Sequence, residues 1–263
     1  MLEWDPGPTP AIRSIFDEAP LSQYIQRPDI FRLEWGPIYY RGRTDGSATI
    51  IVIGQDPAAD ENLARRILVG EAGQRVQGFL SKLGITRSYI MINSVLYSIY
   101  GQFGDKLRDF MDISSVKAWR NSLLDALVAS NNVQVILAFG LAARHVIESW
   151  PGAGLFQNQD KIFYLTHPTA AQRAVRQNWN ARMAQIAEKV SPDSDGQVKL
   201  TPYHGSKFTK SDVSRIPLFD FGFGAPLWMG TGRMAVRLKN NKALPKKVIE
   251  RPTILWTALD NKG

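Results

Sequence analysis

Three short stretches of this chain end in polar side chains that together could bind and cleave something small and polar. Gln55 and Asp56 follow one apolar run, Asn93 follows a second, and His167 follows a third. A carboxylate can orient a water molecule or stabilise a cation, and a carboxamide offers one donor beside one acceptor. An imidazole can donate a hydrogen bond to an oxygen on which negative charge develops. These residue types together indicate a site that grips its ligand and breaks a bond in it.

The elements that must position these residues are strands of a parallel sheet. Residues 50–53 are apolar and β-branched without alternation, which favours a strand buried on both faces. Gly54 then allows a turn, and Pro57 suits the first turn of a following helix. Similar apolar runs cover residues 89–92, 133–139 and 161–165. Because ligands of open parallel sheets gather at the carboxyl ends of the strands, we expect the polar residues to converge on one crevice.

Helical spacing of apolar residues alternates with these strands. The pattern predicts helices near residues 12–18, 62–69, 76–83, 114–127, 141–150 and 176–190. Gly84 suits the end of the third of these helices, and Ser114 or Ser115 suits the start of the fourth. Strands that alternate with helices predict an α/β protein of three layers, α/β/α, around a central, mainly parallel four-stranded sheet.

Composition excludes several classes of protein. The 263 residues are 44% hydrophobic, and no apolar run approaches the roughly 20 residues of a membrane span. The N-terminal residues lack the pattern of a secretory signal, so we expect a cytoplasmic monomer that does not contact membranes. The chain has no Cys and three His, which excludes disulfides and sulfur-ligated clusters. We expect no metal and no organic cofactor.

The charge favours an acidic partner such as nucleic acid. The net charge is +8, and residues 199–251 hold eleven Lys or Arg against three acidic residues. A polar stretch at 191–196 with Pro and Gly marks a boundary. We therefore expect an N-terminal cover at 1–47, an α/β domain at 48–190, and a basic extension at 191–263 that packs on or near the face that binds DNA. The aromatic and glycine-rich residues 218–232 suit either a nucleic-acid surface or a wrap over the edge of the core.

The strand-end motifs carry a resemblance to a known family. GQDP at 54–57, INSVL at 92–96 and HPT at 167–169 resemble, in order and spacing, the three active-site motifs of the uracil-DNA glycosylase superfamily. LVGEAGQ at 68–74 resembles the corresponding region of its iron-sulfur branch, whose cysteines this chain lacks. The resemblance covers roughly residues 50–189.

This resemblance implies hydrolysis of the N-glycosidic bond of a flipped-out deoxyuridine in DNA, the first step of base excision repair. Asp56 would orient a water and stabilise the cationic sugar, and His167 would hydrogen-bond the carbonyl oxygen of the departing uracil. Asn93 would read uracil O4 and N3–H, a pattern that cytosine inverts. Further contacts to the base are expected from Gly54, Gln55, Ala58 and Leu68. Contacts to DNA are expected from Arg65, Arg66, Thr169, Ala171, Gln172 and Arg173.

Three positions depart from the better-known members of that family. Ala58 and Ala59 stand where those members have Tyr and His, so the aromatic gate against the thymine methyl is missing. Leu68 stands where relatives place a Phe that stacks on uracil. The loop after the HPT motif lacks the Leu that enters the DNA helix, and Arg173 is the favoured substitute.

Each residue alone also has an ordinary structural interpretation. Asp56 could cap a helix, Asn93 could form a turn, and His167 could be a hydrogen-bonded loop residue. Arg65 and Arg66 could form a solvated helix face. Two other functions stay open: a non-catalytic module that binds uracil or abasic sites in DNA, and an N-glycosidase that acts on free nucleosides. Asp56 argues against the first and the basic extension against the second.

Overall fold

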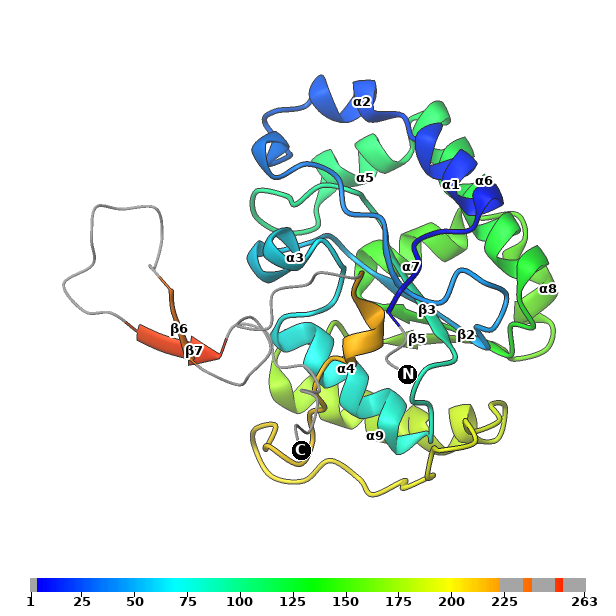
Figure 1. Ribbon diagram of the computed structural model, residues 1–263, viewed down its shortest axis with the longest axis vertical. Coiled ribbons are helices and arrows are strands. Elements are labelled where there is room, and N and C mark those ends of the chain that lie inside the picture. The colour runs from blue at the N-terminus through cyan, green and yellow to red at the C-terminus, as the bar shows by residue number, and fades with distance from the viewer. Residues whose placement is uncertain (1–3, 223–233, 238–248, 253–263) are drawn as a thin grey trace.

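A sheet lies at the centre of the protein, between helices (Figure 1). It has five strands in the order β1-β3-β2-β4-β5. The structure, a computed structural model, describes residues 4–222 and two short strands at 234–237 and 249–252. Neighbouring strands run in parallel except β1, which pairs antiparallel with β3. The strands are β1 (Tyr40–Gly42), β2 (Ile50–Gly54), β3 (Tyr89–Asn93), β4 (Val135–Phe139) and β5 (Ile162–Leu165).

The predicted α/β class and mainly parallel sheet are confirmed, but the predicted number of four strands is wrong. The additional strand, β1, is three residues long and lies at the edge of the sheet. A strand this short has too few residues for its side-chain alternation to be recognised. The pair β6 (Met234–Arg237) and β7 (Ile249–Pro252) forms a separate antiparallel ribbon.

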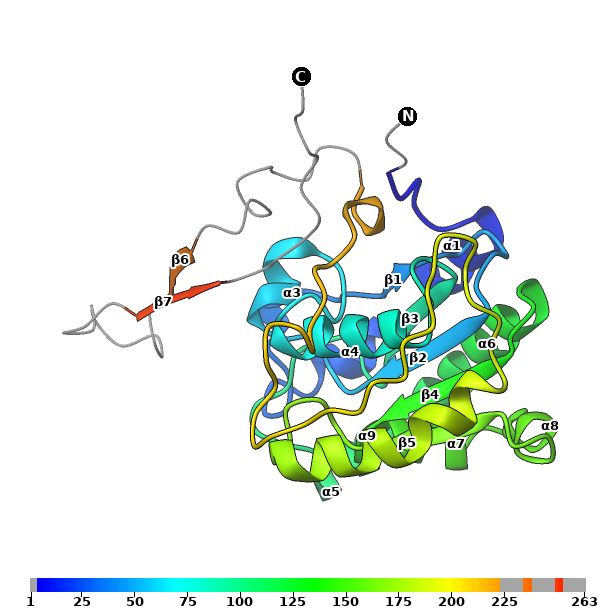
Figure 2. The ribbon, with the colours of Figure 1, turned by 90° about the horizontal axis from the view of Figure 1, so that it is seen from below.

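Helices cover both faces of the central sheet (Figure 2). One face packs against α1 (Pro10–Asp17), α6 (Ser114–Ser130) and α7 (Leu141–Glu148). The other face packs against α4 (Glu71–Lys82) and α9 (Gln172–Ala187). Shorter helices are α2 (Leu21–Ile25), α3 (Ala59–Ala64), α5 (Asp105–Met111) and α8 (Ala153–Gln157), with 3-10 turns at Leu33–Trp35 and Leu218–Asp220. Every helix in this described part of the chain is too short or too polar to cross a membrane.

Strand β2 lies in the middle of the sheet and is buried on both sides, as predicted. Ile51 and Ile53 pack into the core beneath α1, α6 and α7, whereas Ile50 and Val52 pack into the core beneath α4 and α9. All four side chains are 0% exposed. The continuous apolar run therefore reflects two cores that share one strand.

Several predicted helix boundaries are wrong. The helix expected at 62–69 is α3, which begins at Ala59 and ends before Arg65, a residue with a left-handed φ of 55°. Pro57 lies before this helix and not in its first turn. Helix α9 begins at Gln172, four residues before the predicted start. Neither serine caps α6, because its N-cap residue is Ile113 and no side chain bonds to that end.

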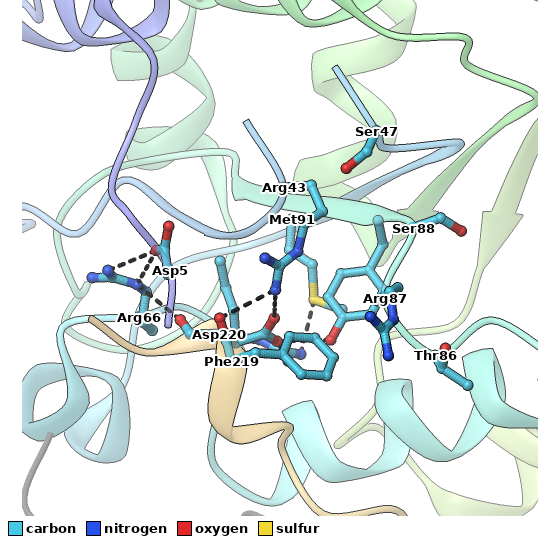
Figure 3. Close-up of polar contacts among 12 residues, drawn as sticks. Asp5, Arg43, Ser47, Arg66, Thr86, Arg87, Ser88, Met91, Phe219 and Asp220 are labelled. Carbon is cyan, nitrogen blue, oxygen red and sulfur yellow. Dashed lines mark hydrogen bonds and ion pairs between the residues drawn. The ribbon is translucent and has the colours of Figure 1, made fainter. Parts of the chain in front are cut away.

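Residues 191–222 return across α9 and α4 (Figure 2) and then reach the sheet through a buried carboxylate. Asp220 is 0% exposed and accepts hydrogen bonds from Arg41 Nη1 at 2.6 Å and Tyr89 Oη at 2.7 Å. It also accepts one from Arg43 Nη2 at 3.2 Å (Figure 3). Nearby, the backbone N–H of Asp5 donates to the carbonyl of Phe221 at 2.9 Å. Removing one partner of a buried ion pair costs about 3–5 kcal/mol, so this cluster fixes both terminal segments on the domain.

The proposed division of the chain at residues 47 and 190 stays a prediction. Residues 223–233, 238–248 and 253–263 lie outside the described residues, and they include most of the aromatic and glycine-rich stretch and nearly half of the basic extension. Within the described part, Phe221 is 2% exposed and packs in a small apolar cluster with Val69.

Candidate active site

The predicted polar residues lie at the carboxyl edge of the parallel strands, where two glycines make room for them. Gly54 pairs with Asn93, and a Cβ at Gly54 would collide with the side-chain oxygen of Asn93. Gly140 follows β4 with a φ of 90°, and a Cβ there would lie 3.1 Å from the Cβ of His167. Glycine at these two strand ends therefore lets the neighbouring amide and imidazole occupy the edge of the sheet.

A cavity of about 500 Å³ opens at this edge, which is within the usual size range of small-molecule sites. Three of the predicted site residues, Gln55, His167 and Thr169, line it. Asp56 and Asn93 are not among its lining residues in the described part of the chain. The lining also includes Gln102, Phe103, Leu141, Arg144, Tyr164, Thr166, Ala170 and Asn178.

His167 is held in the neutral form that donates from Nε2. The backbone N–H of Thr169 donates to His167 Nδ1 at 3.3 Å, and the Thr169 hydroxyl lies 3.1 Å from the same nitrogen. Burial lowers the pKa of His167 below its ordinary value of 6.5. Because Nδ1 accepts a backbone hydrogen bond, the single proton of the neutral ring resides on Nε2. The imidazole is thus an uncharged hydrogen-bond donor at neutral pH.

Asp56 is a desolvated carboxylate held by its neighbours. Its Oδ1 accepts a hydrogen bond from Gln55 Nε2 at 3.0 Å, and its Oδ2 accepts one from the backbone N–H of Ile99 at 3.1 Å. Burial raises the pKa of Asp56 to about 6, against the lowering effect of these two bonds. The interpretation of Asp56 as a helix cap is wrong, because α3 begins after Ala58. Asp56 is therefore ionised at neutral pH, and no cationic side chain of the described residues pairs with it.

Asn93 has a buried amide with unused hydrogen-bonding capacity. The residue is 7% exposed, and neither Nδ2 nor Oδ1 has a hydrogen-bond partner in the described part of the chain. A buried polar group left unsatisfied costs about 1–3 kcal/mol. Such a group is explained when a ligand supplies the missing donor and acceptor.

Leu68 lies beside Gly54 in a loop that Glu61 holds in place. Leu68 has a left-handed φ of 52° and is 8% exposed. The buried Glu61 carboxylate accepts hydrogen bonds from the backbone N–H groups of Val69 at 2.8 Å, Gly70 at 3.0 Å and Ala58 at 3.0 Å. It thereby connects the turn after β2 to the loop that carries Leu68. The sequence reasoning missed Glu61, although an acidic residue at the third position of a helix is a capping signal.

The comparisons with known proteins agree with this geometry. A family model of the uracil DNA glycosylase superfamily matches residues 42–190, which is more than half of the chain. The chain belongs to this superfamily. No curated protein matches it. The matched region contains all three strand-end motifs of this glycosylase-superfamily protein, whereas most of the N-terminal segment and residues 191–222 lie outside it.

Arg65 and Arg66 make contacts within the protein. Arg65 follows α3, is exposed, and donates to the carbonyl oxygens of Trp35 at 2.6 Å and Pro37 at 2.7 Å. Arg66 donates to Asp5 at 2.8 Å and to the carbonyl oxygen of Asp220 at 3.1 Å (Figure 3). The interpretation as a solvated helix face is wrong, and these bonds assign Arg66 to the fold.

The loop after the HPT motif leads directly into α9. Ala171 is exposed and precedes the helix, and Gln172 Oε1 accepts a hydrogen bond from the backbone N–H of Phe208 at 2.9 Å. Arg173 is exposed in the first turn of α9, and Thr169 orients His167. Of the residues expected to contact DNA, Arg173 is thus the longest cationic side chain that this loop presents to solvent.

Sequence reasoning missed the far wall of the cavity. Phe103 lies in a loop between Gly101 and Gly104, and Arg144 and Tyr164 form a cation–π pair with 4.8 Å between the guanidinium carbon and the ring centre. Phe103 could have been identified from the sequence, because it is an aromatic residue near two glycines and outside any helical spacing. Arg144 could not have been identified in this way. It also forms an ordinary helix ion pair with Glu148, four residues further along the chain.

Proposed function

We propose that this protein is a uracil-DNA glycosylase that hydrolyses the N-glycosidic bond of a flipped-out deoxyuridine and leaves an abasic site in DNA. Superfamily membership supports glycosylase chemistry in general. The observation that carries the narrower proposal is the buried amide of Asn93, whose donor and acceptor have no partner among the described residues. Uracil supplies O4 as an acceptor and N3–H as a donor, whereas cytosine supplies the opposite pattern at these positions.

The charges at the site support cleavage of the glycosidic bond. In the transition state positive charge grows on the deoxyribose and negative charge grows on the departing base. Asp56, ionised above a pH of about 6, orients a water and stabilises the sugar cation. His167 donates from Nε2 to the carbonyl oxygen of uracil, a kind of interaction whose removal costs about 10²–10³-fold in kcat. Water is the nucleophile, so the strand is not cut and no lysine takes part.

Substrate choice depends on the wall beside Gly54. Ala58 is exposed and too small to block the methyl group of thymine. In our proposal Leu68, which Glu61 holds beside Gly54, blocks the methyl group of thymine instead. The enzyme therefore rejects thymine. Absence of release from a G·T duplex is the expected result.

The base must leave the helix before it reaches this site, and the hole that it leaves must be filled. Flipping costs a few kcal/mol of stacking and pairing. Arg173 at the start of α9 can stack a planar guanidinium between bases and also bond a phosphate. We assign it the role of the wedge that holds the helix open.

The proposal is tested on a labelled oligonucleotide that contains a single uracil, followed by alkaline cleavage of abasic sites. The wild-type protein should release uracil with EDTA present, and Asp56→Asn should lose most of this activity while it still binds uracil DNA. Asp160→Asn removes the same charge from an exposed turn and serves as the matched control. Binding to uracil or abasic DNA without turnover by the wild type would favour the non-catalytic module instead. Release from free deoxyuridine that undamaged DNA does not inhibit would favour a nucleoside N-glycosidase.

A further inference from the structure

A second cavity, of about 350 Å³, lies between α9 and residues 203–206 and contains an unpaired buried arginine. Arg176 is 5% exposed, and its Nη1 is buried with no hydrogen-bond acceptor in the described part of the chain. Arg41 provides the contrast, because it is 0% exposed but bonds to Asp220, Gln77 and the carbonyl of Ile67. Burying a cation without a partner is strongly unfavourable. Arg176 Nη1 therefore has an unfilled hydrogen bond within the described part of the protein.

The other groups that line this cavity are suited to an oxyanion. The hydroxyl of Tyr203 is buried and has no hydrogen-bond partner among the described residues. Its position is fixed, because Asn180 bonds to both backbone groups of Tyr203 and the ring packs against Trp179 and Phe208. Arg173 and Ser206 also line the cavity, and its described lining contains no Asp or Glu. Two guanidinium groups and two hydroxyls can each donate to the oxygens of a phosphate.

The second cavity lies near the loop that carries His167 of the candidate active site. Arg75 Nη1 donates to the carbonyl of Pro168 at 2.6 Å, and its guanidinium lies 4.7 Å from the ring centre of Phe208. Arg173 and Arg176 are one helical turn apart and follow His167 along the chain by six and nine residues. A strand whose base enters the first cavity would therefore pass close to the second.

We propose that this second cavity binds a backbone phosphate of the DNA strand whose uracil enters the active site. The inference rests on the proposed function, but it adds a contact that the superfamily match does not contain. Tyr203 and Ser206 lie beyond residue 190, where that match ends. Residues 203–206 thus complete a phosphate site on α9 and give the segment after the α/β domain a role in holding DNA.

The test is the salt dependence of binding to an undamaged labelled duplex, measured by fluorescence anisotropy between about 50 and 200 mM salt. Arg176→Met should lower the slope of log affinity against log salt by about 0.9, the value for one lost phosphate contact. Affinity at the lowest salt should fall about tenfold, the low end for a hydrogen bond to a charged group. Melting of the free Arg176→Met protein should occur no lower than in the wild type, because the variant removes an unpaired buried charge. Arg182→Met removes an exposed cation from the same helix and should leave the slope unchanged.

An unchanged slope and affinity in folded Arg176→Met would overturn the phosphate site. If that variant does not fold, Tyr203→Phe decides, because it removes only the buried hydroxyl; binding equal to the wild type would reject the proposal. Inorganic pyrophosphate is the probe for a free anion. If it raises the melting temperature of the wild type but not of Arg176→Met, while both proteins bind DNA equally, the cavity binds a free anion and the DNA proposal is rejected.

These outcomes separate the phosphate site from the proposed function. A wild-type protein that releases uracil, with a salt slope independent of Arg176, would refute the phosphate site alone. A wild-type protein whose DNA binding depends on Arg176 but that never releases uracil would refute the glycosylase assignment alone. A wild-type protein that does not bind DNA would refute both.

Discussion

Neutralising Asp56 should stabilise the folded protein while it removes activity, because the carboxylate is ionised in a desolvated position. Burial raises the pKa of Asp56 from its ordinary value of 3.8 to about 6. In the unfolded chain the pKa returns to the ordinary value, so the folded state binds the proton more tightly. The free energy of unfolding therefore includes a favourable contribution from protonated Asp56 below a pH of about 4. That contribution is lost as the pH rises through 6, and the loss amounts to at most about 3 kcal/mol.

Asp56→Asn removes this pH dependence and makes the magnitude measurable. Urea unfolding of the wild type and the variant at pH 4 and pH 8 gives two differences in the free energy of unfolding. The amide disrupts one of the two hydrogen bonds to Gln55 and Ile99, at a cost of about 1 kcal/mol at either pH. Subtracting the difference at pH 4 from that at pH 8 cancels this cost. The variant should gain about 2.4 kcal/mol more at pH 8 than at pH 4, because an unfolded carboxyl is already more than half ionised at pH 4.

The catalytic rate should report the same ionisation. Below a pH of about 6 the wild-type kcat should fall about tenfold for each pH unit, because only ionised Asp56 can stabilise the sugar cation. His167 should cause no further change in kcat above pH 6.5, because burial lowers its pKa and the ring is already neutral there. Equal stability differences at pH 4 and pH 8, or a kcat that is flat between pH 5 and pH 7, would refute the reasoning from burial.

Three further substitutions test the other roles. Asn93→Ala should abolish uracil release with little change in melting temperature, because no described residue bonds to the amide; a parallel fall of both would make Asn93 structural. His167→Ala should lower kcat about 10²–10³-fold and leave binding to uracil DNA largely intact, and an unchanged kcat would remove His167 from the mechanism. Arg173→Ala should reduce activity on paired uracil much more than on single-stranded uracil. Equal losses would demote Arg173 from wedge to phosphate contact, and no loss would exclude it from the site.

The sequence predicted the sheet well where strands are buried on both faces. A continuous apolar run such as Ile50 to Ile53 has few alternatives to a central parallel strand, and all of its residues are 0% exposed. The short edge strand β1 and the early end of α3 could not be predicted in this way. Both depend on contacts between distant residues, since β1 is completed by pairing with β3 and the chain after α3 is held by Glu61.

The residues of the candidate site also divide into those that the sequence could predict and those that depend on contacts in the fold. The strand-end motifs identified Gln55, Asp56, Asn93 and His167, because a parallel sheet brings the ends of its strands together without further information. The roles of Arg66 and Arg176 could not be read from sequence. Both are cations in or beside helices, but Asp5 reaches Arg66 from the N-terminal segment, whereas no described acidic residue pairs with Arg176.

Buried polar groups in this protein fall into two kinds, and the distinction separates fold from function. Arg41 and Asp220 are completely buried and satisfy each other, so they fix the chain and leave no capacity for a ligand. Asn93 and Arg176 are nearly as buried, yet the described part of the chain offers their amide and guanidinium no partner. Leaving such groups unsatisfied lowers the stability of the free protein, and in our proposal that cost is recovered when a base and a phosphate bind. Under the same proposal, the free energy recovered on binding contributes to extracting the base from the helix, a step that itself costs a few kcal/mol.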